Sequence, residues 1–331
     1  MRVGDLRQVA SVRRIVLDDG AERGVRALSF STGGGLDFWV LTDRSMDIGT
    51  LSWQGVQLAW QTAAGFRAPA LINPEDDGGR GFNRGFGGFL ITCGLNHIRQ
   101  PMNGEPLHGR LPFTPARLTG YGEEWERAEP TLFCEGEVVQ SRYGGETLRL
   151  KRRIEAPIGG ASMRILDTVE NLGAEQVPQA ILYHFNLGFP AIASGSTIEL
   201  NGDRLLGPTE LPDGGLMPAR TWPTGGEGEA RCVVKSPSNA GAAGLAVTFA
   251  FDTRTLGHLQ VWHDLRKHAG VLSIEPCSSP FPEKGDGPPE ALAPGERREY
   301  RLEVSLAGTP ATAFAPNCQV VEKADGFLPN Q

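Results

Sequence analysis

The stretch Ile181-Leu182-Tyr183-His184-Phe185-Asn186-Leu187-Gly188-Phe189-Pro190 predicts a β-strand, because it is apolar, rich in aromatic residues and closed by a glycine and a proline. Successive side chains of a strand point to opposite faces of the sheet. His184 and Asn186 therefore share one face, opposite Tyr183 and Phe185. This arrangement predicts a polar pocket lined by a sheet. The alternative is a core histidine that hydrogen-bonds a neighbouring backbone group.

Short strand-like segments separated by turn residues fill most of the chain. The 44 glycines and 24 prolines make up about a fifth of the 331 residues, which leaves little room for long helices. Spacing of this kind is typical of antiparallel sheets. We therefore predict an all-β fold, a large antiparallel β-sandwich, as a single domain over residues 1–331. Residues 61–90 predict a long loop, and residues 195–240 predict irregular loops with short strands.

Charge and composition exclude several classes of partner. The net charge is −7 and there is no basic block, so we expect no nucleic-acid partner. The most apolar run, 240–251, is too short to span a bilayer, and the first 20 residues lack the apolar core of a signal peptide. We therefore expect no membrane partner. The sequence does not predict the oligomeric state.

The five cysteines are widely spaced and include no Cys-x-x-Cys pair, which argues against a zinc site or a disulfide framework. Reduced thiols fit a cytoplasmic protein. His97 and His108 could form a pair of metal ligands, but no third or fourth ligand follows at a recognisable spacing. We expect neither a metal nor a cofactor.

Polar residues in three other segments are candidates for a site. His108 precedes Gly109, whose missing side chain allows the backbone to approach a ligand closely. Glu275 lies among apolar residues of a predicted strand, where burial would raise the pKa of its carboxyl group. Its alternative is a charge in water on an edge strand. Trp262 is either an aromatic residue that faces a ligand or a core residue.

Further candidates lie in turns and loops. Arg84 lies near the end of the long loop of residues 61–90. Arg44 and Asp47 flank a turn, where we favour a structural ion pair over a place in a site. His263 follows Trp262 on the opposite face of its strand.

His108-Gly109, Tyr183-His184-Phe185-Asn186-Leu187 and Ile274-Glu275-Pro276 together resemble elements of the aldose 1-epimerase (galactose mutarotase) superfamily. The likeness covers roughly residues 10–310 and is greatest to a bacterial branch without an assigned function. The spacing His-x-Asn differs from the family's His-x-x-Asn. The family's sugar-binding aspartate has no clear equivalent in this sequence, and Asp252 and Asp264 are candidates for it.

The resemblance implies a mutarotase-like β-sandwich that interconverts sugar anomers, with a small sugar or sugar acid as its partner. Glu275 would act as the base at O1 and His184 as the acid at the ring oxygen, because both proton transfers need groups that titrate near the working pH. His108, Arg84, Asn186 and Trp262 would bind the substrate. A keto-sugar isomerase or epimerase acting at carbon, and a sugar-binding protein without turnover, remain alternatives.

Overall fold

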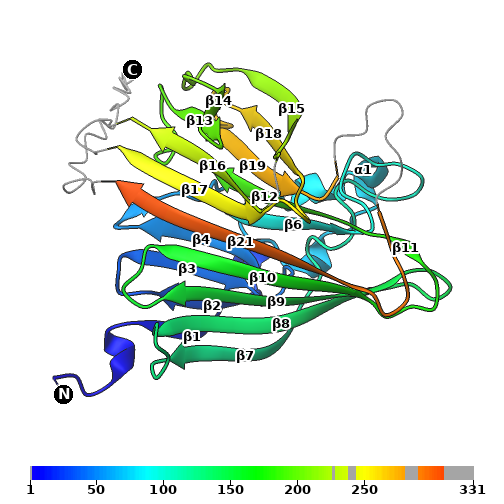
Figure 1. The fold of residues 1–331 in the computed structure, drawn as a ribbon, viewed down its shortest axis with the longest axis horizontal. Helices are drawn as coiled ribbons and strands as arrows, with labels where there is room; N and C mark the ends of the chain where they lie inside the picture. The colour runs from blue at the N-terminus through cyan, green and yellow to red at the C-terminus, as the bar shows by residue number, and fades with distance from the viewer. Residues whose placement is uncertain (1, 226–227, 238–243, 280–289, 309–331) are drawn as a thin grey trace, which may run out of the picture.

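The computed structural model describes residues 2–225, 228–237, 244–279 and 290–308, and these form an all-β fold (Figure 1). Every strand pair in these ranges is antiparallel, as predicted. Four cysteines are buried free thiols, at positions 93, 134, 232 and 277. Cys318 lies outside the described residues.

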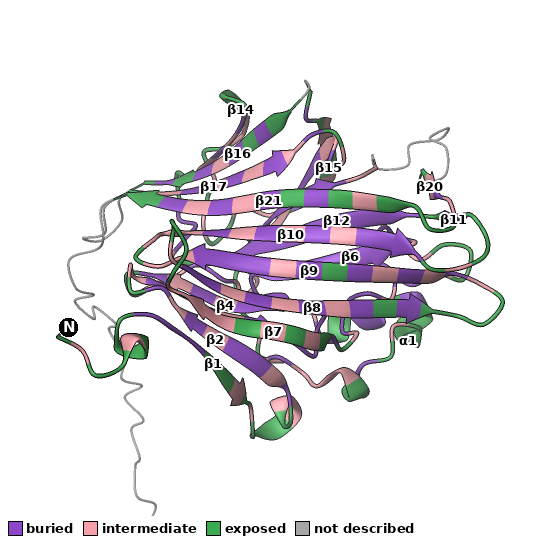
Figure 2. Cartoon of the chain, turned by 60° about the horizontal axis from the view of Figure 1, so that its bottom comes forward, coloured by how far each residue is buried: buried purple, intermediate pink, exposed green. Residues whose placement is uncertain are grey.

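The largest sheet has nine strands and forms one layer of the sandwich. In spatial order its strands are β14 (Asp203–Leu206), β13 (Thr197–Leu200), β16 (Glu229–Ser236), β17 (Leu245–Asp252), β21 (Arg297–Gly308), β10 (Ser162–Asn171), β9 (Thr147–Pro157), β8 (Thr131–Ser141) and β7 (Arg117–Glu124). Buried residues alternate with more exposed ones along several of these strands, because one face of the sheet covers the core and the other meets solvent (Figure 2).

Two five-stranded sheets form the opposite layer (Figure 1). The first runs in chain order through β1 (Ser11–Val16), β2 (Arg26–Ser31), β3 (Leu36–Leu41), β4 (Asp47–Trp53) and β5 (Val56–Gln57). The second has the order β15 (Leu216–Pro223), β18 (His258–Asp264), β19 (Val271–Cys277), β12 (Ala180–Leu187) and β6 (Leu90–Leu95). A β-bridge between Ala59 and Leu187 joins the two.

The remaining elements are short. β11 (Val177–Pro178) pairs with β20 (Ala291–Leu292), and the helical turns are η1 (Leu6–Gln8), η2 (Gly20–Glu22), η3 (Pro69–Leu71), α1 (Asp76–Gly79) and η4 (Gly81–Arg84). The last three turns lie in the predicted loop of residues 61–90. Within the described ranges, no helix has the length and hydropathy that crossing a membrane requires.

The hydrophobic core lies between the two layers and draws on all three large sheets. Phe185 of β12 packs against Phe249 of β17 with 4.9 Å between ring centroids, and Phe38 of β3 belongs to the same buried cluster. Burial of such aromatic side chains supplies much of the hydrophobic stabilisation of a sandwich. The core therefore fixes β12 from one side.

β12 is buried along its whole length, because β19 and β6 flank it and both of its faces are covered. Tyr183 and Phe185 point into the core with the other odd-numbered residues, whereas His184 and Asn186 lie on the opposite face. The face assignment made from the sequence is confirmed. One strand thus carries the centre of the core and the start of a polar site.

A buried ionic cluster joins the two layers beside the core. Arg152 of β9 makes a bidentate ion pair with Asp167 of β10, at 2.9 and 2.6 Å, and its third nitrogen lies 3.3 Å from Asp47. The Arg44 guanidinium instead donates to the carbonyl oxygens of residues 85 and 87 and lies 4.7 Å from the ring of Phe113. Arg44 and Asp47 are therefore structural residues, although their hydrogen-bond partners are not each other.

The described residues between 195 and 237 are more regular than the sequence suggested. They form β13, β14, β15 and β16, and β16 pairs on both sides within the nine-stranded sheet. The reason is an alternation in β16, where Ala230, Cys232 and Val234 are buried and the residues between them are not. The neighbouring glycines and prolines mask this alternation in the sequence.

Candidate active site

A cavity of about 250 Å³ opens on the face of the second five-stranded sheet that carries His184. β12 contributes His184, β19 contributes Glu275, and β18 contributes Gln260 and Trp262. The loops around β6 and η4 complete its walls. Its volume lies just below the roughly 300–1,000 Å³ of pockets that hold drug-sized ligands, so it suits a molecule of about one sugar ring.

The sheet register places three polar side chains side by side on adjacent strands. Asn186 lies opposite Ser273 and Leu182 lies opposite Cys277, so His184 and Glu275 face each other midway between these pairs. Gln260 pairs with Glu275 on the other side. The His184 Nε2 atom lies 3.5 Å from the Glu275 Oε1 atom. Residues 91 positions apart in the sequence thus meet through the spacing of neighbouring strands.

The hydrogen bonds of Asn186 fix the orientation of the His184 ring. The Asn186 amide nitrogen donates to the carbonyl oxygens of Gly88 and His184, at 3.1 and 3.2 Å. Its Oδ1 atom is therefore the acceptor for the His184 Nδ1–H, at 2.7 Å, and for the Ser273 hydroxyl, at 2.9 Å. Nδ1 carries a proton in this arrangement, which leaves Nε2 as the atom that gains or loses one beside Glu275.

Glu275 is buried and held at one oxygen. Its Oε2 atom accepts a hydrogen bond from the Gln260 amide, and Gln260 in turn accepts one from Arg99 at 2.6 Å. The Oε1 atom has no hydrogen-bond partner among the described residues. Burial raises the pKa of the Glu275 carboxyl above its ordinary value, and the neighbouring His184 and Arg99 oppose that rise. This environment suits a carboxyl group that exchanges a proton during a reaction.

His108 lies on the other side of His184, with 5.5 Å between the ring centroids. Its Nδ1 atom is 3.0 Å from the carbonyl oxygen of Ile98, so Nδ1 carries the proton and Nε2 is an acceptor in the neutral ring. Burial, together with the nearby His184, lowers the pKa of His108 to about 3. His108 therefore presents a neutral nitrogen lone pair, which suits a hydroxyl group of a ligand.

A family model supplies the classification of the chain. The family described as "Domain of unknown function (DUF4432)" matches residues 22–214, more than half of the sequence. The chain belongs to the DUF4432 family. The match includes β12 with His184 and the His108 loop, whereas Glu275 and Gln260 lie beyond it. No curated protein matches this DUF4432 member.

Solved structures show that the DUF4432 chain has the galactose mutarotase-like fold. A candidate aldose 1-epimerase from Klebsiella pneumoniae superposes with a TM-score of 0.71 at 22% identity, over 89% of this chain and 83% of that one. A galactose mutarotase-like protein from Clostridium acetobutylicum gives 0.58 at 13% identity, over 90% and 98%. A candidate mutarotase from Salmonella typhimurium gives 0.59 at 11% identity, over 93% and 96%. At these identities the likeness is one of fold.

The structure brings four of the six predicted site residues of this DUF4432 chain to the cavity wall, namely His108, His184, Trp262 and Glu275. Asn186 lies behind the wall, where it orients His184. Arg84 lies outside the cavity, because its guanidinium makes a bidentate ion pair with Asp77 on the surface, at 2.7 and 2.8 Å.

Other open candidates also lie elsewhere. Asp252 and Asp264 pair with Arg254 and Arg266 outside the cavity, and His263 lines a different hollow. Gly109 approaches the protein backbone, since a Cβ atom there would lie 2.4 Å from the Gly94 carbonyl oxygen. The lack of a side chain at Gly109 therefore allows close packing against the protein's own backbone, and not against a ligand as we expected.

The cavity is also lined by residues that the sequence did not single out for the site, among them Arg80, Arg99 and Gln260. Gln260 could have been found, because it shares a strand face with Trp262. Arg99 follows β6 in a loop, where no periodicity indicates the direction of a side chain. Its guanidinium reaches both Gln260 and the carbonyl oxygen of Ser279, at 2.6 and 2.7 Å, and so ties the loop to β18 and β19.

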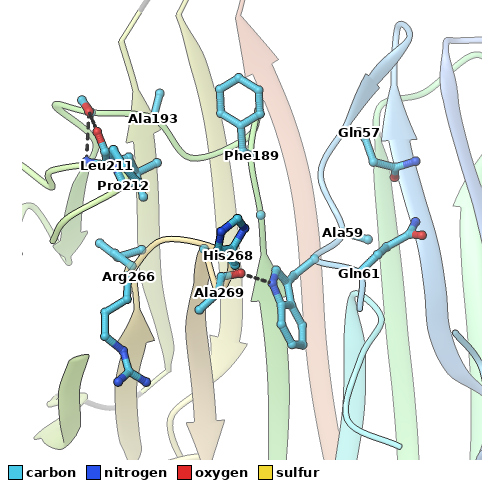
Figure 3. Close-up of a pocket in the computed structure, with 15 residues that line it drawn as sticks. Gln57, Ala59, Gln61, Phe189, Ala193, Leu211, Pro212, Arg266, His268 and Ala269 are labelled. Atoms are coloured by element: carbon cyan, nitrogen blue, oxygen red, sulfur yellow. Dashed lines mark hydrogen bonds between the residues drawn. The ribbon is translucent and has the colours of Figure 1, made fainter. Parts of the chain in front are cut away.

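A larger hollow of about 800 Å³ lies beyond the end of β12 (Figure 3). Phe189, His268 and Arg266 line it, and Trp60 closes one side through a 2.8 Å hydrogen bond to the carbonyl oxygen of Ala269. No carboxylate belongs to its wall among the described residues. It therefore lacks a facing acid and base, and we place the candidate active site of the DUF4432 chain at the smaller cavity.

Proposed function

We propose that this protein is an aldose 1-epimerase, which interconverts the anomers of a free sugar at the cavity of His184 and Glu275. The observation that carries the proposal is the 3.5 Å approach of the His184 Nε2 atom to the Glu275 Oε1 atom in a cavity of sugar size. Among the described residues, neither atom has a competing hydrogen bond that would block proton transfer to a ligand. The mutarotase-like fold supports the same reaction class.

Anomer interconversion needs one base and one acid at the two ends of an O–C–O unit. The ionised Glu275 removes the proton from O1 while the protonated His184 delivers its Nε2 proton to the ring oxygen. The C1–O5 bond breaks, the O1 lone pair completes the aldehyde, and both protein groups become neutral. After C1 rotates, the same transfers in reverse close the ring as the other anomer.

Other cavity residues support this chemistry without exchanging protons. Asn186 holds the proton on Nδ1 of His184, so that Nε2 is the transferring atom. Gln260 holds Oε2 of Glu275, which leaves Oε1 for the substrate. Trp262 lies 6.5 Å from His184 between ring centroids, where it offers an apolar surface to a pyranose.

The test is a Glu275→Gln variant assayed by NMR exchange between sugar anomers. Loss of the base should reduce the enzymatic rate about 10²–10⁴-fold, since general acid–base groups contribute factors of that size. The probes are freshly dissolved D-glucose, D-galactose, D-glucuronate and D-galacturonate. Glu303→Gln on β21 is the matched control and should retain full activity.

Two outcomes would overturn the proposal. A folded Glu275→Gln variant with unchanged turnover would remove the carboxyl from the reaction. Wild-type protein that binds the probes but leaves anomer exchange at its spontaneous rate would be a sugar-binding protein. Reactions run in heavy water separate the third alternative, because an isomerase or epimerase acting at carbon introduces deuterium into a C–H bond and mutarotation does not.

A further inference from the structure

The cavity contains an arginine that has no carboxylate partner. Arg80 lies between α1 and η4, is exposed at the cavity wall, and donates from Nη1 to the Gln100 amide oxygen at 3.0 Å. Among the described residues, no carboxylate lies within ion-pair distance of it. By contrast, Arg84 pairs with Asp77 in the same loop, at 2.7 Å.

The charge of the cavity wall also favours an anion. Arg80 places a guanidinium group on the wall, and Glu275 is the one carboxylate within the part of the wall that the structure describes. That carboxylate is already held by Gln260 and faces His184. Amides, two imidazoles and the Arg99 guanidinium, which donates to Gln260 and Ser279, make up the remaining polar groups near it. A neutral ligand would leave the charge of Arg80 without an anionic partner among the described residues.

The positions of these groups give the ligand a direction. Glu275 is 1% exposed and lies at the closed end of the cavity, whereas Arg80 and Gln100 are exposed and lie at its open end. The hydrogen bond between Arg80 and Gln100 joins a cation to a neutral amide, so an anion would replace it with a stronger contact. Arginine presents a planar pair of N–H donors that matches the two oxygens of a carboxylate.

We infer that the substrate is a monosaccharide with an anionic group on its terminal carbon, and that Arg80 binds this group while the anomeric carbon lies between His184 and Glu275. The inference rests on the proposed function and adds the substrate class to it. Carboxylate, sulfonate and phosphate share the required chemistry. A cavity of about 250 Å³ leaves room for one ring and not for a longer saccharide.

The test compares sugars that differ only at the terminal carbon. Wild-type protein is assayed with D-glucuronate against D-glucose, D-galacturonate against D-galactose, and glucose 6-phosphate, with both ligand-detected NMR binding and anomer exchange. We expect KM or Kd to be at least about tenfold lower for an acid than for its neutral partner, because a hydrogen bond to a charged group is worth that factor or more. The comparison of the uronates with glucose 6-phosphate also shows whether the site prefers a carboxylate or a phosphate.

Arg80→Gln is the decisive variant, and Arg117→Gln on β7, 80% exposed at its side chain, is the control. Arg80→Gln should remove the preference for the acids, while Arg117→Gln should keep both this preference and the wild-type kcat on the neutral sugars. Equal affinity of wild type for acids and neutral sugars would overturn the inference, as would a preference that survives in Arg80→Gln. Acid binding that depends on Arg80 without anomer exchange would refute the proposed reaction and keep the anion site.

Discussion

Replacement of His108 by asparagine should change how the free energy of unfolding depends on pH. The folded protein keeps His108 neutral, because burial and the nearby His184 lower the pKa of its ring to about 3. In the unfolded chain the same ring titrates near 6.5. Asparagine can place an N–H donor near the position of Nδ1, and it tolerates the φ of 64° at this position.

The sign follows from proton binding. Below pH 6.5 the unfolded state binds a proton at His108, whereas the folded state does not. The free energy of unfolding therefore decreases as the pH falls towards about 3. Each pH unit in this window is worth up to 1.36 kcal/mol. Between pH 7 and pH 5 the wild type should therefore lose about 2 kcal/mol through this residue alone, and His108→Asn should not.

Urea denaturation at several pH values from 5 to 8 measures this difference. The comparison is between slopes of the free energy of unfolding against pH, so that a constant loss of stability in the variant does not matter. His268→Asn is the matched control, because His268 is exposed and has a similar φ of 70°. Parallel curves for wild type and His108→Asn would refute a buried neutral imidazole at this position.

Two further substitutions test the supporting structure. Asn186→Ala removes the acceptor of the His184 Nδ1–H. The kcat for anomer exchange should therefore fall about tenfold or more with little change in KM. An unchanged kcat in a folded variant would contradict the positioning role of Asn186. Arg152→Met leaves Asp167 buried without its ion pair and should cost about 3–5 kcal/mol in urea denaturation, whereas Arg153→Met, on the more exposed face of the same strand, should cost less than about 1 kcal/mol.

The sequence predicts the fold well because strand alternation is a local signal. In β12 the period of two assigns Tyr183 to the core and His184 to the opposite face, and the structure confirms both. In β16 the same signal is present, but surrounding glycines and prolines hid it. The β-propensity of single residues is a weak guide to the conformation of a segment that pairs with a strand on each side.

Apart from His108, the residues that the sequence predicted and the structure brings to the cavity lie on strands. His184, Trp262 and Glu275 project from strands, and their directions follow from alternation. Arg84 and Arg99 come from loops, whose side-chain directions depend on contacts far away in the sequence. Arg84 pairs with Asp77 on the surface, and Arg99 donates to Gln260 of β18. Both contacts depend on the tertiary structure, and residue spacing in the sequence does not predict them.

The register between β18 and β19 also limits which insertions and deletions the gene can accept. Gln260 and Glu275 remain paired across the two strands only if the number of residues between the turn and the cavity stays the same in both strands. Removing one residue inside β19 would turn Glu275 towards the sandwich interior, since one step reverses every side chain in a strand. Changes in length should therefore accumulate in the connecting turn at residues 265–270, and a deletion scan across this hairpin would show tolerance there and abrupt loss within the strands.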